Sequence, residues 1–272
     1  MRLNPFAKKG TVIPVVPISG GIGMAAPLRS GVSAAGLEPQ LVRAFATKGP
    51  AVALRINSPG GSAVQSHLIF KRIRQLAAEK KKAVIVGVED GAASGGYMIA
   101  IAGDEIVVDP SSIVGSIGVV FAGFGFPRLI DKLGIDRRVH TAGQSKVILD
   151  PFQPEKPEDV ERLKQLQREV HETFIAMVKA RRPRLADDPD LFTGAFWSGE
   201  RAVALGLVDR VGDLHAVLRE KYGEDVTLKV MGAEKGLIRR RLGLGPAMSA
   251  QAVADAAMGT IEERLLWNRY GL

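Results

Sequence analysis

The stretch Gly91-Ala92-Ala93-Ser94-Gly95-Gly96-Tyr97 decides the fold of this chain. An apolar run over residues 83–88 precedes it, and small and apolar residues over 97–102 follow it. This order predicts a buried strand, a tight turn and a buried helix, with Ser94 at the helix start. The two glycines after the serine allow a sharp turn of the backbone and the close approach of a ligand.

Ser94 has two interpretations at this point. Most serines that precede a helix cap it, because their hydroxyl accepts a hydrogen bond from a backbone amide. Alternatively the hydroxyl is a nucleophile, since the amides at a helix start lack intrahelical acceptors and can stabilise a developing negative charge. The stretch by itself favours the cap.

A second unit of the same kind lies earlier in the chain. The apolar residues 51–56 lead into Asn57-Ser58-Pro59-Gly60-Gly61, and Ser62 is a good cap for a helix that extends to about Glu79. Two successive strand-turn-helix units predict an α/β fold with a mostly parallel sheet flanked by helices. Because ligands collect at the carboxyl ends of parallel strands, both glycine turns are expected at one site. The first turn matches neither the P-loop nor the dinucleotide-binding spacing.

Other segments give further predictions. Residues 11–18 indicate a strand, and their two prolines place it at a sheet edge or a strand end. Residues 136–141 indicate another strand, and 157–181 give the longest helical pattern, with Pro157 in its first turn. We expect three parts: an N-terminal extension over 1–10, one domain over 11–231, and a basic linker with an amphipathic helical arm over 232–272.

Composition excludes several classes of protein. The chain has 272 residues, a formal net charge of +8 and no cysteine, which rules out disulfides, thiolate metal sites and a cysteine nucleophile. Its basic clusters suit an anionic membrane surface or nucleic acid, but aromatic residues make up only 6% and do not alternate with basic ones. We therefore expect no nucleic-acid partner and leave peripheral contact with an anionic membrane open. Without a signal-peptide pattern or about 18 consecutive apolar residues, we expect a cytoplasmic protein without a transmembrane helix, with membrane association left open.

Four motifs follow one another along the chain: Asn57-Ser58-Pro59-Gly60-Gly61, Ala93-Ser94-Gly95-Gly96-Tyr97, Val114-Gly115-Ser116-Ile117-Gly118-Val119 and Gly143-Gln144-Ser145-Lys146. In this order they resemble the bacterial signal peptide peptidase family of the SppA and SohB type, whose members are serine proteases. The resemblance covers roughly residues 12–230. It implies the Clp protease/crotonase fold group, with repeated ββα units and a mostly parallel sheet flanked by helices.

The resemblance also implies roles for single residues. Ser94 matches the nucleophile, Lys146 the general base of a serine-lysine dyad, and Gly61 and Gly95 the backbone donors of the oxyanion hole. It implies an endopeptidase that cleaves apolar peptides, such as signal peptide remnants, through an acyl-enzyme. No cofactor or metal is implied. The family forms homo-oligomeric rings in which a site can combine residues of neighbouring subunits.

Two alternatives compete with this interpretation. A Ser-His-Asp triad would need a histidine soon after the serine helix, but residues 102–139 contain none. We therefore prefer Lys146 as the base and treat His140 as a surface or strand residue. The second alternative is a non-proteolytic protein of the crotonase fold that uses the same turns to bind acyl-CoA or to act as a scaffold.

Overall fold

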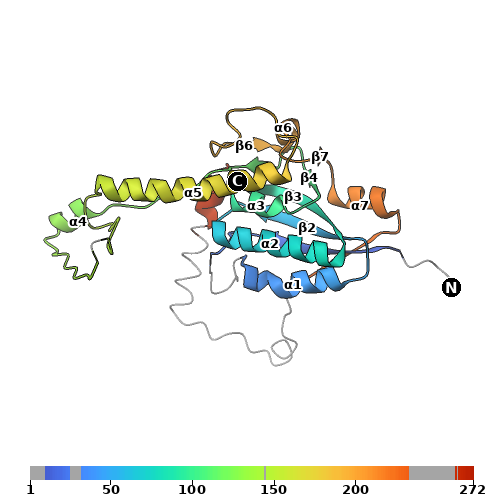
Figure 1. The fold of residues 1–272 in the computed structure, drawn as a ribbon, viewed down its shortest axis with the longest axis horizontal. Helices are drawn as coiled ribbons and strands as arrows, with labels where there is room; N and C mark the ends of the chain where they lie inside the picture. Colours follow the sequence, from blue (N-terminus) through green and yellow to red (C-terminus); the bar gives the residue numbers. More distant parts are fainter. Residues whose placement is uncertain (1–9, 25–31, 144, 233–260, 262) are drawn as a thin grey trace, which may run out of the picture.

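The computed structural model describes residues 10–24, 32–143, 145–232, 261 and 263–272 (Figure 1). An eight-stranded sheet forms its centre, with the strand order β6-β5-β3-β2-β1-β8; off this path, β4 pairs with β3, and β7 pairs with β4. All pairings are parallel except that of β5 with β6. The strands are β1 Val12–Ser19, β2 Ala51–Ser58, β3 Ala83–Ala93, β4 Glu105–Val108, β5 Ile113–Gly115, β6 Phe196–Ser198, β7 Arg210–Val211 and β8 Thr227–Val230. The helices are α1 Ala34–Ala46, α2 Ala63–Lys80, α3 Gly95–Ala100, α4 Pro127–Lys132, α5 Pro157–Arg181, α6 Gly199–Ala204 and α7 Leu214–Tyr222.

Helices cover both faces of the sheet. Side chains on β1 alternate, so that Val16 and Ile18 enter the larger core while Ile13 and Val15 enter the smaller one. The larger core also takes the apolar sides of α1, α2 and α3 and part of α5, whereas α7 covers the smaller core. The predicted fold class, a mostly parallel sheet flanked by helices, is confirmed.

The predicted position of the first strand is wrong. β1 lies between β2 and β8 and is therefore an interior strand. It tolerates its prolines because the two pairings are staggered: β8 pairs with Val12 to Val15, and β2 pairs with Val15 to Ser19. Pro14 is therefore paired only with β8, and Pro17 only with β2. Each proline has one unpaired side, as it would in an edge strand, so its missing N–H breaks no ladder hydrogen bond.

The site-forming turns lie at the carboxyl ends of neighbouring strands. β2 ends at Ser58 and is followed by the first glycine turn, while β3 ends at Ala93 and is followed by Ser94. β3 is longer than its predicted apolar run, and its last residues pair with β5, with Ala93 opposite Gly115. The sheet therefore brings the turn after β2, the turn after β3 and the segment after β5 to one edge.

Helix α5 carries a projecting segment, residues 121–156, which we call the arm. Figure 1 shows α4 and its flanking loops beyond the start of α5, away from the sheet. The strand predicted over 136–141 is absent, and these arm residues have no regular structure because no sheet edge is available to pair with them. Within the arm, the rings of Phe126 and Phe152 pack with centroids 5.7 Å apart, and Arg137 lies over Phe152.

The bounds of the long helix are confirmed, since α5 covers Pro157–Arg181. Most of the C-terminal linker and helix predicted over 232–272, a segment distinct from the arm, lies outside the described residues. Its last part is described: residues 263–268 are helical, and Tyr270 is buried against the body of the protein. In the described parts of the chain, no helix has the length and apolar character needed to cross a membrane.

Candidate active site

The turn after β2 is shaped by a buried serine. The hydroxyl of Ser58 donates to the carbonyl of Gly20 (2.7 Å) and accepts from the amide of Gly60 (3.2 Å). Gly60 and Gly61 both have positive φ angles, of 105° and 137°, which explains why glycine stands at each position. Ile22 forms a β-bridge with Gly61: the Ile22 amide donates to the Gly60 carbonyl, and the Ser62 amide donates to the Ile22 carbonyl. Neither of these hydrogen bonds uses the amide of Gly61.

Ser94 occupies a strained backbone conformation at the start of α3. Its φ is 52° and its ψ is −119°, a combination that residues with a side chain rarely adopt. The sheet holds it there, because the Ser94 amide donates to the carbonyl of Gly115 (2.8 Å). Strain of this kind at a strand-to-helix turn is typical of residues whose side chain must be presented to a ligand.

The Ser94 hydroxyl does not cap the helix. Although Ser94 stands at the N-cap position of α3, its side chain makes no capping hydrogen bond. Elsewhere in the described part of the chain its hydroxyl also has no hydrogen-bond partner. The structural interpretation that the short stretch favoured is therefore wrong, and the physical reason is the positive φ of Ser94, whereas capping residues adopt an extended backbone.

Two backbone amides lie next to Ser94. The amide of Gly95 is the first of α3 and has no acceptor within the helix. The amide nitrogen of Gly61 is 3.4 Å from the position that a Cβ on Gly95 would occupy, so the two glycines are in close contact across the turn. The structure thus brings Ser94, Gly61 and Gly95 together.

A buried tyrosine of helix α3 anchors the helix to the later part of the chain. The hydroxyl of Tyr97 donates to the carbonyl of Leu207 (2.7 Å), and the side chain is fully buried. Burial raises the pKa of Tyr97 well above its ordinary value, with the negative charge of Asp209 adding to the effect and Arg182 opposing it. The first turn of α3 is therefore attached to the later part of the chain through a neutral phenol.

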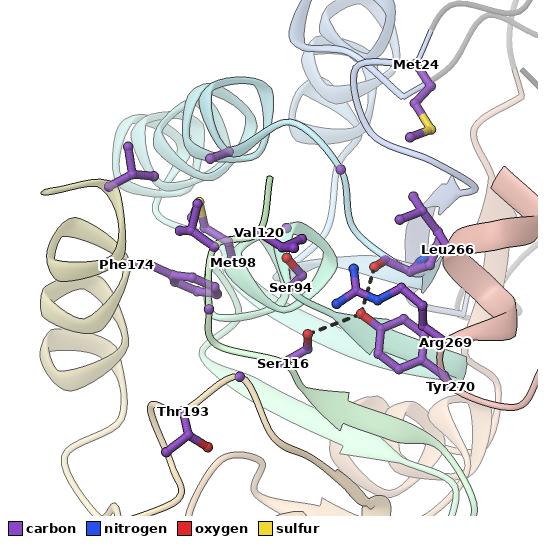
Figure 2. Close-up of a pocket in the computed structure, with 18 residues that line it drawn as sticks. Met24, Ser94, Met98, Ser116, Val120, Phe174, Thr193, Leu266, Arg269 and Tyr270 are labelled. Atoms are coloured by element: carbon purple, nitrogen blue, oxygen red, sulfur yellow. Dashed lines mark hydrogen bonds between the residues drawn. The ribbon is translucent and has the colours of Figure 1, made fainter. Parts of the chain in front are cut away.

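A cavity of about 460 Å³ lies over Ser94 (Figure 2). Ser94, Gly61 and Gly95 line it, and the segment after β5 contributes Ser116, Gly118, Val119 and Val120. Apolar side chains form one side of it: Met98, Val120, Val170 and Phe174. Figure 2 shows Met98, Val120 and Phe174 grouped around Ser94.

Lys146 does not lie at this cavity in the single chain. It belongs to the arm, is exposed, and is not among the residues that line the cavity. Val170 of α5 does line it, and Pro157, where the arm joins α5, is about 13 residues or roughly 20 Å of helix away. The described residues that line the cavity include no lysine and no histidine, so no side chain of the same chain is placed there as a base.

The histidines lie elsewhere. His140 is exposed on the arm, outside any strand. His171 on α5 is within hydrogen-bonding distance of the Ile117 carbonyl (3.0 Å), behind the cavity wall. Neither position provides a partner for Ser94.

Sequence reasoning missed the C-terminal contribution to the cavity. Leu266, Arg269 and Tyr270 line it, although more than 150 residues separate them from Ser94 in the chain. No local pattern could have placed them, because a tail of mixed composition carries no signal for its tertiary contacts. Met98 and Phe174 lie in the helices predicted over 97–102 and 157–181, but the sequence did not indicate that they line a cavity.

Comparison with known proteins agrees with this geometry. Residues 76–227 match the sequence profile of peptidase family S49. The chain belongs to peptidase family S49. The resemblance derived from the four motifs is therefore confirmed, and the matched region of the S49 chain includes Ser94 and Lys146.

Relatives of this S49 chain carry different names. A protein of Brucella melitensis that is named Na(+)/H(+) antiporter NhaA is 56% identical over 284 residues and covers 100% of this chain. A putative protease of Synechocystis sp. is 32% identical and covers 89% of this chain and 90% of that protein. The probable protease SohB of Haemophilus influenzae is 35% identical over 70% of this chain and 53% of that protein. The chain spans only 39% of the Brucella protein, so the name of that protein describes something much longer than this S49 chain.

Solved structures share the fold. The 1510-N membrane-bound stomatin-specific protease, solved as a lysine-to-alanine mutant in complex with a substrate peptide, has a TM-score of 0.53 and 17% identity over 92% of this chain and 99% of that chain. A serine-to-alanine mutant of the same protease has a TM-score of 0.52 and 16% identity over 82% of this chain and 98% of that chain. At this level of identity the likeness shows that the S49 chain has the same fold as these proteases.

Proposed function

We propose that this chain is a serine endopeptidase with Ser94 as its nucleophile. The observation that carries the proposal is that Ser94 has a strained backbone and a hydroxyl that does not cap the helix, next to the amides of Gly61 and Gly95. Membership of family S49 supports it, as does a 34% identical relative of Arabidopsis thaliana that is named a serine protease.

In the proposed reaction the Ser94 oxygen attacks the scissile carbonyl carbon. The negative charge that develops on the carbonyl oxygen is stabilised by the amides of Gly61 and Gly95, each contributing roughly 3 kcal/mol. The amine leaves with a proton, which forms an acyl-enzyme on Ser94, and water then releases the acid by the same steps in reverse. A base is needed twice, first to take the hydroxyl proton and then to activate the water.

We assign that base to Lys146 of a neighbouring subunit. The cavity has no lysine or histidine among its described lining residues, while Lys146 lies exposed on an arm that extends away from it. A lysine acts as a base only when its amine is neutral, which burial favours. Insertion of the arm into the cavity of a second copy would bury this amine next to Ser94.

The surface of the arm supports assembly into a homo-oligomer. Phe124 is 82% exposed and Leu133 is 63% exposed, which is unusual for side chains of this size. Other arm residues extend the same apolar surface: Phe121, Phe126, Leu129, Ile135, Val147, Ile148 and Phe152. An apolar surface of this extent marks a protein-protein contact, and we propose a second copy of this chain as the partner.

The cavity also suggests the substrate class. Its side formed by Met98, Val120, Val170 and Phe174 favours an apolar side chain next to the scissile bond. We therefore propose apolar peptides as substrates, and this is consistent with the peptide complex of the structurally similar stomatin-specific protease.

A peptide-cleavage assay tests the proposal. We expect Ser94→Ala and Lys146→Ala each to lose at least about a thousandfold in kcat, because nucleophile and base act as a unit. Ser111→Ala and Lys48→Ala, at exposed positions outside the cavity and outside the arm, are the matched controls and should retain activity. A fluorophosphonate probe should label the wild type and leave Ser94→Ala unlabelled. Full activity of Ser94→Ala would show that the function is not that of a Ser94 peptidase.

A further inference from the structure

The C-terminal residues 263–272 form part of the Ser94 cavity. Leu266, Arg269 and Tyr270 line the same cavity as Ser94, and Tyr270 is only 8% exposed. The segment is also packed against the sheet, since a Cβ on Gly91 would lie 3.3 Å from the ring of Trp267. These contacts make the segment a wall of the site.

Tyr270 joins the two walls between which a peptide would have to lie. Its hydroxyl hydrogen-bonds with the carbonyl of Pro59, in the turn after β2 (3.3 Å), and with the hydroxyl of Ser116, after β5 (3.2 Å). Its ring packs edge-on against Phe196 with centroids 5.1 Å apart. Because this one hydroxyl contacts both walls, Tyr270 closes the cleft at that end. Figure 2 shows the hydroxyl of Tyr270 pointing to Ser116.

Arg269 brings a positive charge to the closed end. Among the described residues that line the cavity it is the only charged one. No hydrogen bond or ion pair engages its guanidinium within the described part of the chain. Figure 2 shows Arg269 extending into the cavity toward Ser94, on the side opposite Phe174. An arginine that lines a neutral cavity without an anionic partner is suited to bind a carboxylate of a ligand.

We propose that Arg269 is a specificity-determining residue that binds a carboxylate of the peptide substrate. The inference rests on the proposed peptidase function and adds to it the orientation of the substrate in the cavity. An apolar side chain lies on the side of Phe174 and Met98, and a carboxylate lies at the end closed by Tyr270. Two sources share this chemistry, the C-terminal carboxylate of the peptide and an Asp or Glu side chain. The closed cleft favours the chain end, because a peptide that ends there does not have to pass Tyr270.

The test compares three versions of one apolar peptide: one with a free C-terminal carboxylate, one with a C-terminal amide, and an amide with aspartate as its last residue. We expect the wild type to cleave the free acid with a kcat/KM about tenfold higher than the plain amide, as one charge-assisted hydrogen bond allows. The aspartyl amide distinguishes a side-chain carboxylate from a chain end. Arg269→Gln should remove the preference, and Arg269→Lys should keep part of it.

Arg264→Gln is the matched control. Arg264 is exposed on the same segment but does not line the cavity, so this variant should keep the wild-type preference. Added salt should weaken the preference, because Arg269 is exposed to solvent on one side. Arg269→Gln is an exposed substitution, and an unchanged thermal midpoint would show that it folds.

Two results would overturn the inference. In the first, the wild type cleaves acid and amide peptides equally while Ser94→Ala is inactive; the peptidase function would then stand and the role of Arg269 would not. In the second, Arg269→Gln lowers the rates for all peptides alike and shifts the pH-rate profile, which would mean that the arginine acts on the catalytic base. Activity of Ser94→Ala would instead contradict the proposed function itself.

Discussion

Gly60 and Ser94 are in contact so close that no side chain fits between them. A Cβ on Gly60 would lie 2.8 Å from the Cβ of Ser94, 2.9 Å from the carbonyl oxygen of Ala93 and 3.0 Å from the amide nitrogen of Gly95. The turn after β2 is therefore in direct contact with the turn that holds Ser94. A change in the backbone of the turn after β2 would therefore displace Ser94 directly, without an intermediate residue.

Substitution Gly60→Ala should inactivate the site. Its φ of 105° strains any side chain, and the added Cβ must also displace Ser94 or the Gly95 amide, so we expect a loss of at least about a hundredfold in kcat. Gly223→Ala is the control, because Gly223 has a φ of 101° but nothing within 4 Å of its Cβ position. Each variant should lose about 1–2 kcal/mol of stability from backbone strain alone. Equal activities in a peptide assay would contradict the role of the contact.

Mixing two inactive variants should restore activity. If Lys146 serves the Ser94 of a neighbouring subunit, random exchange of Ser94→Ala and Lys146→Ala subunits makes about one site in four complete. The measurement is peptide cleavage after subunit exchange, with exchange verified by native mass spectrometry. Activity that stays at zero despite verified exchange would place both residues of the dyad within one chain.

A charge on the arm should disrupt assembly. Phe124→Glu introduces a carboxylate at the most exposed large apolar side chain of the arm, and burying it in an interface would be costly. We expect a smaller mass in sedimentation velocity together with a loss of activity. Val42→Glu, at an exposed apolar position on α1, should change neither quantity. An unchanged mass for Phe124→Glu would show that the arm surface is not the contact.

Replacing Arg182 should destabilise the protein without touching the site. Arg182 makes two hydrogen bonds to Asp209 (2.9 and 3.0 Å) and one to the Gly206 carbonyl (3.0 Å), and its side chain is 9% exposed. Arg182→Met leaves Asp209 without this partner, and we expect a loss of about 2–4 kcal/mol in urea unfolding.

The matched control is Arg138→Met, since the Arg138–Asp136 pair is about 80% exposed on both sides. We expect it to cost less than about 0.5 kcal/mol. Comparable losses for the two variants would mean that burial does not decide the strength of these pairs.

Tyr97 should make the fold sensitive to alkaline pH. Burial raises the pKa of Tyr97 above its ordinary value of 10.0, so the folded state keeps the phenol neutral while the unfolded state loses the proton. Its contribution to stability is therefore complete below pH 10 and is lost as the pH rises above that value.

Urea unfolding between about pH 7 and pH 11 measures this dependence. Tyr97→Phe removes the titrating group and should flatten the alkaline decline relative to the wild type. At neutral pH the variant should be about 1 kcal/mol less stable, because the Leu207 carbonyl loses its hydrogen bond. Identical alkaline slopes would show that Tyr97 does not carry the effect.

The sequence by itself determined the features that depend on neighbouring residues. The apolar runs and glycine turns gave the parallel sheet, and proline and acidic residues at the start of α5 gave its bounds, Pro157–Arg181. The juxtaposition of Ser94, Gly61 and Gly95 also followed from local order, because the carboxyl ends of adjacent parallel strands meet at one edge.

Only the tertiary structure decided how the rest of the chain completes this edge. The stagger of β1 between β2 and β8, the lack of a partner for residues 136–141, and the hydrogen bond between Ser116 and Tyr270, 154 positions apart, all depend on pairings over long sequence distances. The motif that ends in Lys146 does not determine where its segment lies relative to Ser94. The fold directs the arm away from its own cavity, because the arm joins α5 at Pro157, the far end of a long, rigid helix that reaches the cavity only at Val170.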